Sequence, residues 1–297
     1  MKSIVIKAVL IGCLFASMFA KAQNPFITRA DIIANFDISP NNQQVCCKWW
    51  GRDDMFKTRV KNLSTQKILD IDSVNLKITT MPSEGISFLS DNLILLEKSG
   101  AIFSYDIKSH EYSKLFDLPG LWRNSFRSFA VTEDKKGIYL LAYRNIYYAN
   151  LQSGIRDSIC LPKGAFVTDI SATANNQLIY GTREGGKDKN RYYIWSWDGR
   201  SPTVNLTDQF SKLIKVPYLV EATSNSDLYI VANTEGIYRF DISTQKATKL
   251  IDNDKEDPVI MIRVSADNKT IYYLTAFHRA VIETVDMDGR RGEAILF

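Results

Sequence analysis

The tetrapeptide Ser-Thr-Gln-Lys occurs twice in this chain, at Ser64–Lys67 and at Ser243–Lys246. Each copy satisfies the Ser-x-x-Lys pattern of serine acyl-enzymes, in which a lysine lies beside the nucleophilic serine. That chemistry needs both residues one turn apart on a helix, whereas both copies stand between short runs of β-forming residues. We therefore interpret both copies as polar turns that join strands.

Two further groups of residues have side chains that bind metal ions. The segment Asp252–Asp257 has acids at alternating positions, as calcium loops do, but it lacks their bend glycine and their closing acid. His110 and His278 fall on different expected loops, so a site with several histidines is not expected. We interpret the acidic segment as a solvated connection and expect neither a metal nor a cofactor. The sequence contains no phosphate-binding loop, dinucleotide fingerprint or nucleophile elbow.

Three cysteines, Cys46, Cys47 and Cys160, lie beyond the N-terminal apolar segment. Cys46 and Cys47 are adjacent in an expected strand, so their side chains point to opposite faces and strain opposes a bond between them. A catalytic thiol needs a histidine partner, and the chain has two histidines. We expect all three cysteines to be small buried hydrophobic residues.

The elements that position these residues repeat along the chain. Six times, a short apolar run ends in a small polar residue followed by a hydrophobic one, at spacings of 44, 44, 46, 45 and 45 residues. The six polar residues are Asn62, Asp106, Asn150, Ser196, Asp241 and Asp286. A period of this length with several short strands per unit is typical of radial repetition, because one unit cannot bury both of its faces alone.

Each period contains four expected strands, here called A to D, separated by turn residues such as Ser90–Asn92 and Asp267–Asn268. Runs that are apolar on both faces, such as Leu93–Leu96, suit sheets covered on both sides. The sequence predicts an all-β, six-bladed β-propeller of four-stranded blades in one domain, residues 23–297, without a helix of ten or more residues. The first unit begins with a strand A and the last ends with a strand D. We therefore expect face packing to close the ring, unless Asn24–Ile33 adds to an edge.

Two segments carry a resemblance to a known family. Ser265–Tyr273, continued by Val285–Gly289, resembles the turn, strand B and closing Asp-Gly turn of bacterial periplasmic Tol-type (WD-like) β-propeller repeats. Ser39–Val45 is similar to the same opening, although Asn42 and Asn268 replace the usual glycine of the A–B turn. The resemblance implies a propeller fold and a binding role, and it brings no catalytic residue with it.

The N-terminus predicts export. Residues 1–22 combine Lys2 and Lys7 with the apolar run Ala8–Ala20 and small residues before the expected cleavage after Ala22, which is the layout of a secretory signal peptide. Leu10–Cys13 also resembles a lipoprotein processing box, which would leave Cys13 lipidated; the apolar residues after Cys13 favour the signal peptide. The apolar run is too short for a membrane span. We expect a periplasmic or cell-surface protein.

Charge excludes some classes of partner. Without residues 1–22 the chain has 34 basic and 33 acidic side chains, a net charge of about +1. Nucleic acids and anionic membrane surfaces are recognised through a basic field, so neither is an expected partner.

Two groups of candidate site residues follow from the propeller. Aligned strand-A positions near the axial channel are Asp37, Phe88, Ala130, Ser171, Glu221 and Arg263, of which Asp37, Glu221 and Arg263 carry charge. These charges would either bracket a small ligand or neutralise one another. The loop-bearing face, formed by the B–C and D–A connections, is expected to carry Arg52, Trp122, Arg123, Arg144, Arg183, Arg191, His278 and Arg279. Arginine and tryptophan are favoured at protein interfaces.

These residues support three hypotheses. The first is a non-enzymatic binding or scaffold module of the bacterial envelope that recognises a protein or envelope component through the loop-bearing face. The second is a propeller enzyme acting on glycans or on lactones and esters, with Asp37, Glu221 and Arg263 at work. The third is a structural spacer in a secretion or motility assembly.

Overall fold

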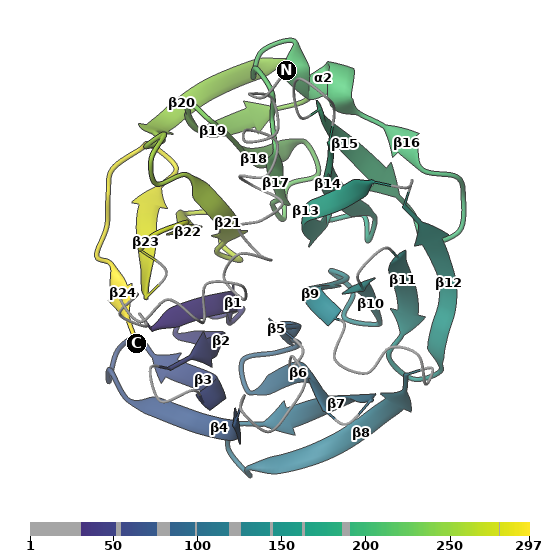
Figure 1. Cartoon of the computed structure of the whole chain (residues 1–297), viewed down its shortest axis with the longest axis vertical. Coiled ribbons are helices and arrows are strands. Elements are labelled where there is room, and N and C mark those ends of the chain that lie inside the picture. Colours follow the sequence, from purple (N-terminus) through teal and green to yellow (C-terminus); the bar gives the residue numbers. More distant parts are fainter. Residues whose placement is uncertain are drawn as a thin grey trace, which may run out of the picture.

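Six four-stranded antiparallel sheets surround a central axis in the computed structural model (Figure 1). The structure describes residues 31–51, 55–75, 84–98, 100–118, 126–142, 145–161, 164–185, 191–278 and 280–297. In each sheet the strands are hydrogen-bonded in sequence order, with the first innermost and the fourth outermost. The predicted six-bladed β-propeller is confirmed.

The blades are numbered in chain order. Blade 1 contains β1 (Ile32–Ile38), β2 (Gln44–Trp50), β3 (Met55–Asn62) and β4 (Ile68–Asn75). Blade 2 contains β5 (Ile86–Phe88), β6 (Leu93–Lys98), β7 (Ala101–Asp106) and β8 (Glu111–Asp117). Blade 3 contains β9 (Phe126–Val131), β10 (Gly137–Ala142), β11 (Asn145–Asn150) and β12 (Gly154–Cys160).

The second half of the ring has the same plan. Blade 4 contains β13 (Ala165–Ala172), β14 (Leu178–Glu184), β15 (Arg191–Trp197) and β16 (Val204–Asn205). Blade 5 contains β17 (Leu219–Ala222), β18 (Leu228–Asn233), β19 (Gly236–Asp241) and β20 (Lys246–Asp252). Blade 6 contains β21 (Val259–Val264), β22 (Thr270–Thr275), β23 (Val281–Asp286) and β24 (Ile295–Leu296). A five-residue helix, α2 (Thr207–Ser211), lies between blades 4 and 5, and no helix of the described residues could span a membrane.

Burial falls from the inside of each blade to its outside. Every residue of β10 is buried, whereas every residue of β8 is exposed or half-buried. Apolar clusters fill the spaces between neighbouring blades; Phe129 and Ile138 of blade 3, for example, pack with Leu95 and Ile102 of blade 2. Strands that are apolar on both faces therefore suit the inner positions, as the sequence indicated.

The polar residue that marks the sequence period closes the C–D turn of each blade. Its side-chain oxygen accepts backbone N–H groups two to four residues ahead, which is an Asx turn. The acceptors are Asn62, Asp106, Asn150, Asp198, Asp241 and Asp286. The marker predicted for blade 4, Ser196, is wrong by two residues because β15 continues to Trp197 before the turn begins. Both Ser-Thr-Gln-Lys copies lie at these turns, where Gln66 and Gln245 have positive φ angles of 58° and 51°.

Asparagine links the A–B turns of neighbouring blades. Asn42, Asn176 and Asn268 have φ angles of 59°, 60° and 55°, a region that asparagine tolerates better than most residues. Their side-chain oxygens accept backbone N–H groups from the preceding blade, at 3.3 Å from Ala266, 3.0 Å from Asp134 and 3.2 Å from Ser224. A glycine could adopt this backbone conformation but could not accept the inter-blade hydrogen bond.

Blade 6 packs face to face on blade 1, and this contact closes the ring. Ile33, Phe36 and Trp49 are buried with Tyr272, Leu274, Ile282 and Ile295 in one apolar cluster. The Lys61 ammonium donates to the Leu296 carbonyl, and the Phe297 ring lies 6.3 Å from that of Trp49. Each blade uses four consecutive strands in the described residues, so no strand is shared between the first and last blades.

Candidate functional site

The channel wall is formed by the innermost strands β1, β5, β9, β13, β17 and β21 (Figure 1). One position recurs in all six, the penultimate residue of the strand, and it is occupied by Asp37, Ser87, Ala130, Ser171, Glu221 and Arg263. The structure corrects the alignment in blade 2: Phe88 is buried with Cys46 and Ile94 between blades 1 and 2 and is not the channel residue. Ser87 takes that place.

Arg263 holds two carboxylates in the channel. Its Nη1 atom lies 3.0 Å from an oxygen of Asp169 in blade 4 and 3.4 Å from an oxygen of Glu221 in blade 5. It also donates to the Ile262 carbonyl at 2.6 Å. All three charged side chains are buried. Because Arg263 belongs to blade 6, one guanidinium ties three successive blades together.

Burial decides how the two acids share charge. Desolvation raises the pKa of Glu221 to about 8, against the lowering effect of Arg263 and with a further increase from Asp169. Burial also raises the pKa of Asp169, which Arg263 opposes through charge and a hydrogen bond. The guanidinium itself is desolvated, but the carboxylates outweigh that effect and raise its pKa. Asp169 has the shorter contact, so at neutral pH the cluster is an Arg263–Asp169 ion pair beside a largely protonated Glu221.

Asp37 binds blade 2 and acts on the Arg263 cluster through its charge, which contributes to the raised pKa of both Glu221 and Arg263. One of its oxygens accepts the Ser87 hydroxyl at 2.6 Å and the Phe88 backbone N–H at 2.7 Å. The Ser171 hydroxyl oxygen accepts the Ala222 N–H of blade 5 at 3.0 Å. Of the three charged residues predicted for the channel, Glu221 and Arg263 therefore meet, and Asp37 joins neighbouring strands instead. Asp169 was missed by sequence reasoning.

Three of the eight residues predicted for the rim of the loop-bearing face lie within the described residues. Arg183, Arg191 and His278 are described by the structure; Arg52, Trp122, Arg123, Arg144 and Arg279 lie outside the described residues. The Arg183 guanidinium lies 5.6 Å from the centre of the Phe166 ring, which is 40% exposed. Arg191 begins β15 and is exposed.

Asp257 organises the B–C connection of blade 6, which carries His278. Its carboxylate accepts the Thr275 hydroxyl at 2.8 Å and the Phe277 backbone N–H at 2.6 Å, and it pairs with His278 Nδ1. A hydrogen bond and the charge of Asp257 raise the pKa of His278. Although desolvation opposes it, hydrogen bonding lowers the pKa of Asp257. The ring of Phe277 is left 68% exposed.

Tyr218 connects blades 4, 5 and 6 on the same face. Its carbonyl accepts the Thr168 hydroxyl of blade 4, and its own hydroxyl donates to the Val259 carbonyl of blade 6 at 2.9 Å. Asn253 donates to the Tyr218 hydroxyl at 3.0 Å and accepts the Val259 N–H at 3.1 Å. Tyr218 thus fixes the positions of three neighbouring strand starts, and its role could not be foreseen because its partners are distant in sequence.

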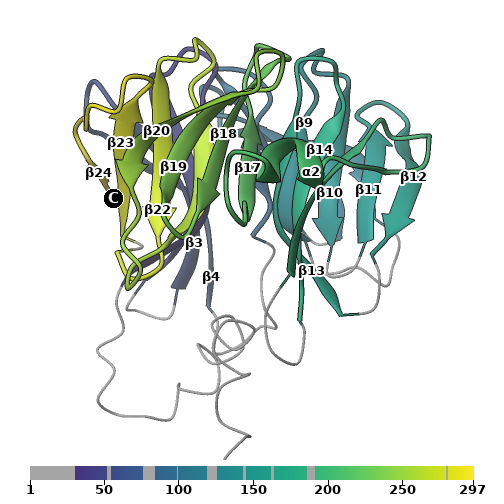
Figure 2. The same ribbon diagram turned by 90° about the horizontal axis from the view of Figure 1, so that it is seen from above.

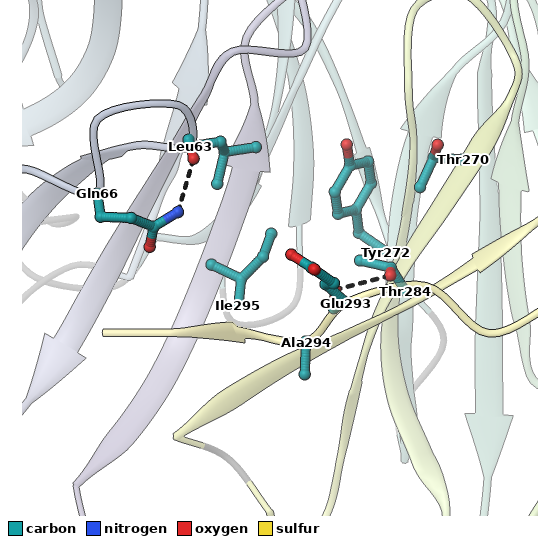
Figure 3. A pocket seen from close by; sticks show the side chains of 8 residues that line it. All are labelled: Leu63, Gln66, Thr270, Tyr272, Thr284, Glu293, Ala294 and Ile295. Carbon is teal, nitrogen blue, oxygen red and sulfur yellow. Dashed lines mark hydrogen bonds between the residues drawn. The ribbon is translucent and has the colours of Figure 1, made fainter.

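A cavity of about 220 Å³ lies at the seam between blades 1 and 6 (Figure 3). Leu63 and Gln66 approach it from the C–D turn of blade 1, and the Gln66 amide donates back to the Leu63 carbonyl at 2.6 Å. The other lining residues come from blade 6: Thr270, Tyr272, Thr284, Glu293, Ala294 and Ile295. Thr284 donates to the Glu293 carbonyl at 2.9 Å, so the polar groups at this seam largely serve the turns that form it.

The three cysteines and the acids of the described residues form no cluster of metal ligands. Cys46 and Cys47 are buried, and desolvation is the main cause that raises the pKa of each thiol. Cys160 is exposed, contrary to the expectation that all three cysteines are buried. Within the described ranges, no three histidine, cysteine, aspartate or glutamate residues come together as metal ligands.

Comparison with known proteins supports the fold alone. No family model matches this chain, and no curated protein matches it. It is similar to a chain in the crystal structure of the mitotic checkpoint complex, with 13% identity and a TM-score of 0.56 over 91% of this chain and 82% of that one. It is also similar to oligogalacturonate lyase in complex with manganese, with 10% identity and a TM-score of 0.54 over 83% of this chain and 86% of that one.

Proposed function

We propose that this protein is a non-catalytic binding or scaffold propeller of the bacterial envelope that recognises a protein or envelope component through its loop-bearing face. The observation that carries the proposal is the closed set of interactions in the channel. Arg263 binds Asp169 and Glu221, while Asp37 binds the first strand of blade 2. These charged groups hold blades together, which leaves recognition to the exposed side chains of the rim.

The predicted signal peptide and the family resemblance support the envelope location. The leader at residues 1–22 and the repeats at Ser39–Val45 and Ser265–Tyr273 fit a Tol-type propeller outside the cytoplasm. The chain that is similar within the mitotic checkpoint complex belongs to a protein assembly, which agrees with a propeller acting as an interaction module. Mass spectrometry of the mature N-terminus tests the location: a chain beginning at Gln23 supports signal-peptide cleavage, a lipidated Cys13 assigns a membrane anchor, and an intact Met1 contradicts export.

Crosslinking in intact cells tests the binding role. The wild-type protein should recover the same partner in repeated experiments, and an Arg183→Glu/Arg191→Glu variant should recover less of it because both charges lie on the loop-bearing face. Val204→Ser, which changes an exposed residue of β16 on the outer edge of blade 4, serves as the control and should behave as the wild type. Repeated failure to recover any partner would contradict the proposal.

An enzyme acting on glycans is the second candidate. Two observations favour it: the similarity to oligogalacturonate lyase, and the raised pKa of Glu221, which keeps a proton on a buried carboxyl group at neutral pH. A panel of glycans, lactones and esters tests it. Turnover that falls at least 100-fold in both Glu221→Gln and Arg263→Met would favour the enzyme; turnover that is absent, or unchanged in both variants, would remove it.

A further inference from the structure

The blade 6 knob, defined here as Ala276–His278, presents an aromatic ring from a fixed backbone. Phe277 is the most exposed large hydrophobic residue of the described chain, at 68%. Asp257 fixes the backbone beneath it by accepting the Phe277 N–H, and the Ala276 N–H donates to the Pro258 carbonyl at 2.9 Å. After the knob, at the start of β23, the Val281 N–H donates to the His278 carbonyl at 3.1 Å. The ring is therefore held in solvent by a structured loop.

This arrangement is suited to binding. An exposed phenylalanine on a loop that is already ordered loses little conformational entropy when a partner covers it. Large aromatic side chains with few rotatable bonds are common anchors of protein interfaces. Blades 4 to 6 are joined beneath the same face by Tyr218 and Asn253, so the support of the knob is rigid as well.

Acidic groups surround the knob. The carboxylate of Asp257 contacts His278, and the charges of Asp254 and Glu283 also act on that imidazole. The exposed Lys255 stands beside Asp254 in the same D–A connection, which also carries the exposed Glu256, and the charges of Arg291 and Glu283 both act on Tyr273. Three carboxylates thus act on the imidazole that follows Phe277 in the chain. A guanidinium or ammonium group complements such a site, because it stacks on the ring and pairs with the acids.

We propose that the blade 6 knob docks a cationic segment of a partner protein, with an arginine or lysine side chain against Phe277 and the carboxylates of Asp254 and Glu283. This inference rests on the proposed function and specifies the chemistry of its partner. Arginine fits better than lysine, because its planar guanidinium can stack on the ring and bind a carboxylate at the same time.

A library of 12-residue peptides displayed on phage tests the chemistry. Selection on the wild-type protein should enrich peptides that contain arginine or lysine, and the strongest peptide is then synthesised for titration. Phe277→Ser should weaken its binding at least tenfold, and Phe277→Leu should weaken it less, because leucine keeps apolar area but loses the π-face. Val204→Ser, which also replaces an exposed apolar side chain by serine but at a 56% exposed position away from the knob, should change binding less than twofold. Thermal unfolding of each variant verifies that the fold is intact.

Several results would overturn the inference. Enrichment of acidic or uncharged peptides, failure to enrich any peptide, or equal binding by wild type and Phe277→Ser would each do so. A wild-type dimer that Phe277→Ser dissociates would assign the knob to a second copy of this chain. If crosslinking in cells recovers a partner equally well with Phe277→Ser, the inference fails while the proposed binding function stands; if it recovers none with wild type, the proposed function fails.

Discussion

Replacing Glu221 with glutamine should make the protein less sensitive to pH. Burial raises the pKa of Glu221 from an ordinary value of 4.5 to about 8. Between these two values the unfolded chain releases the Glu221 proton and the folded chain keeps it. The stabilising effect of that proton is fully present below pH 4.5 and is lost as the pH rises toward 8. Glutamine has no proton to lose, so the variant escapes this penalty.

The size of the effect follows from the interval between the two pKa values. At about 1.36 kcal/mol for each pH unit, the interval from 4.5 to about 8 corresponds to on the order of 5 kcal/mol. Asp169 also has a raised pKa, and it is present in both proteins. Relative to wild type, the free energy of unfolding of Glu221→Gln should therefore rise by a few kcal/mol between pH 5 and pH 8.

Urea unfolding followed by tryptophan fluorescence at pH 5, 6, 7 and 8 measures this difference. Glu133→Gln, which makes the same chemical change at an exposed position in the A–B turn of blade 3, is the matched control and should show a nearly constant difference from wild type. If the difference between Glu221→Gln and wild type stays constant over this range, Glu221 is ionised in the folded protein. The assignment of a neutral Glu221 beside the Arg263–Asp169 pair would then be wrong.

Three further predictions concern the connections between blades and the knob. Asn268→Ala should lower the free energy of unfolding by about 1–2 kcal/mol in urea titrations, because alanine loses the hydrogen bond and disfavours the positive φ angle. Asn268→Gly should lower it by less, because glycine loses the same hydrogen bond but accepts the positive φ angle. Equal losses in the two variants would contradict this account. Gly181→Ala should cost about 1–3 kcal/mol, since a Cβ there would lie 2.4 Å from the Thr168 hydroxyl, and an unchanged urea midpoint would refute the crowding. His278→Ala should lower the melting temperature more at pH 6 than at pH 9. The pKa of His278 is raised, so the protonated imidazole pairs with Asp257 and stabilises the fold at low pH, and this stabilisation is lost at high pH. A loss of melting temperature that does not depend on pH would exclude the pairing.

The propeller could be predicted because its repeat has a local chemical cause. An Asx turn needs an asparagine or aspartate at one position of each C–D hairpin, so these residues recur whenever a blade ends. Blade 4 shows the limit of that signal. Its turn uses Asp198, while Ser196, which fits the spacing better, still belongs to β15 and pairs with Ile179 and Val204. Spacing alone cannot show where a strand stops.

The channel could be predicted in part, because counting back from the A–B turn identifies the innermost strand. The count fails in blade 2, where it led to Phe88 although Ser87 occupies the channel position and Phe88 is buried between blades. It also misses Asp169, which precedes Ser171 by two residues in β13 and lies beside a bulge in that strand. A bulge shifts the register of a strand, and neither its position nor the direction of a long arginine side chain can be read from local sequence.

The loop-bearing face was the least predictable region, since its geometry depends on contacts between distant residues. The arginines of the expected loops predicted Arg183 and Arg191 as binding residues of this face, but nothing in the sequence indicated that Phe277 is exposed there. The signal for that residue is an aromatic ring inside a polar connection, and such residues are usually buried. Its exposure follows from Asp257, which lies 20 residues earlier in the chain and accepts the Phe277 N–H. Only the folded structure brings the two together.

The seam between blades 6 and 1 is not bridged by the charged side chains of the channel. Arg263 ties blade 6 back to blades 4 and 5, and Asp37 ties blade 1 forward to blade 2, so these channel side chains bind away from the seam. The seam depends instead on apolar packing around Trp49, on the hydrogen bond from the Ala266 N–H to Asn42, and on the bond from Lys61 to the Leu296 carbonyl. Its outer strand, β24, pairs with β23 through only two residues, and the cavity lies beside it. In the channel, the described interactions join blade 1 to blade 2 and blades 4 to 6 to one another, so the closure of the ring between blades 6 and 1 relies on these contacts outside the channel.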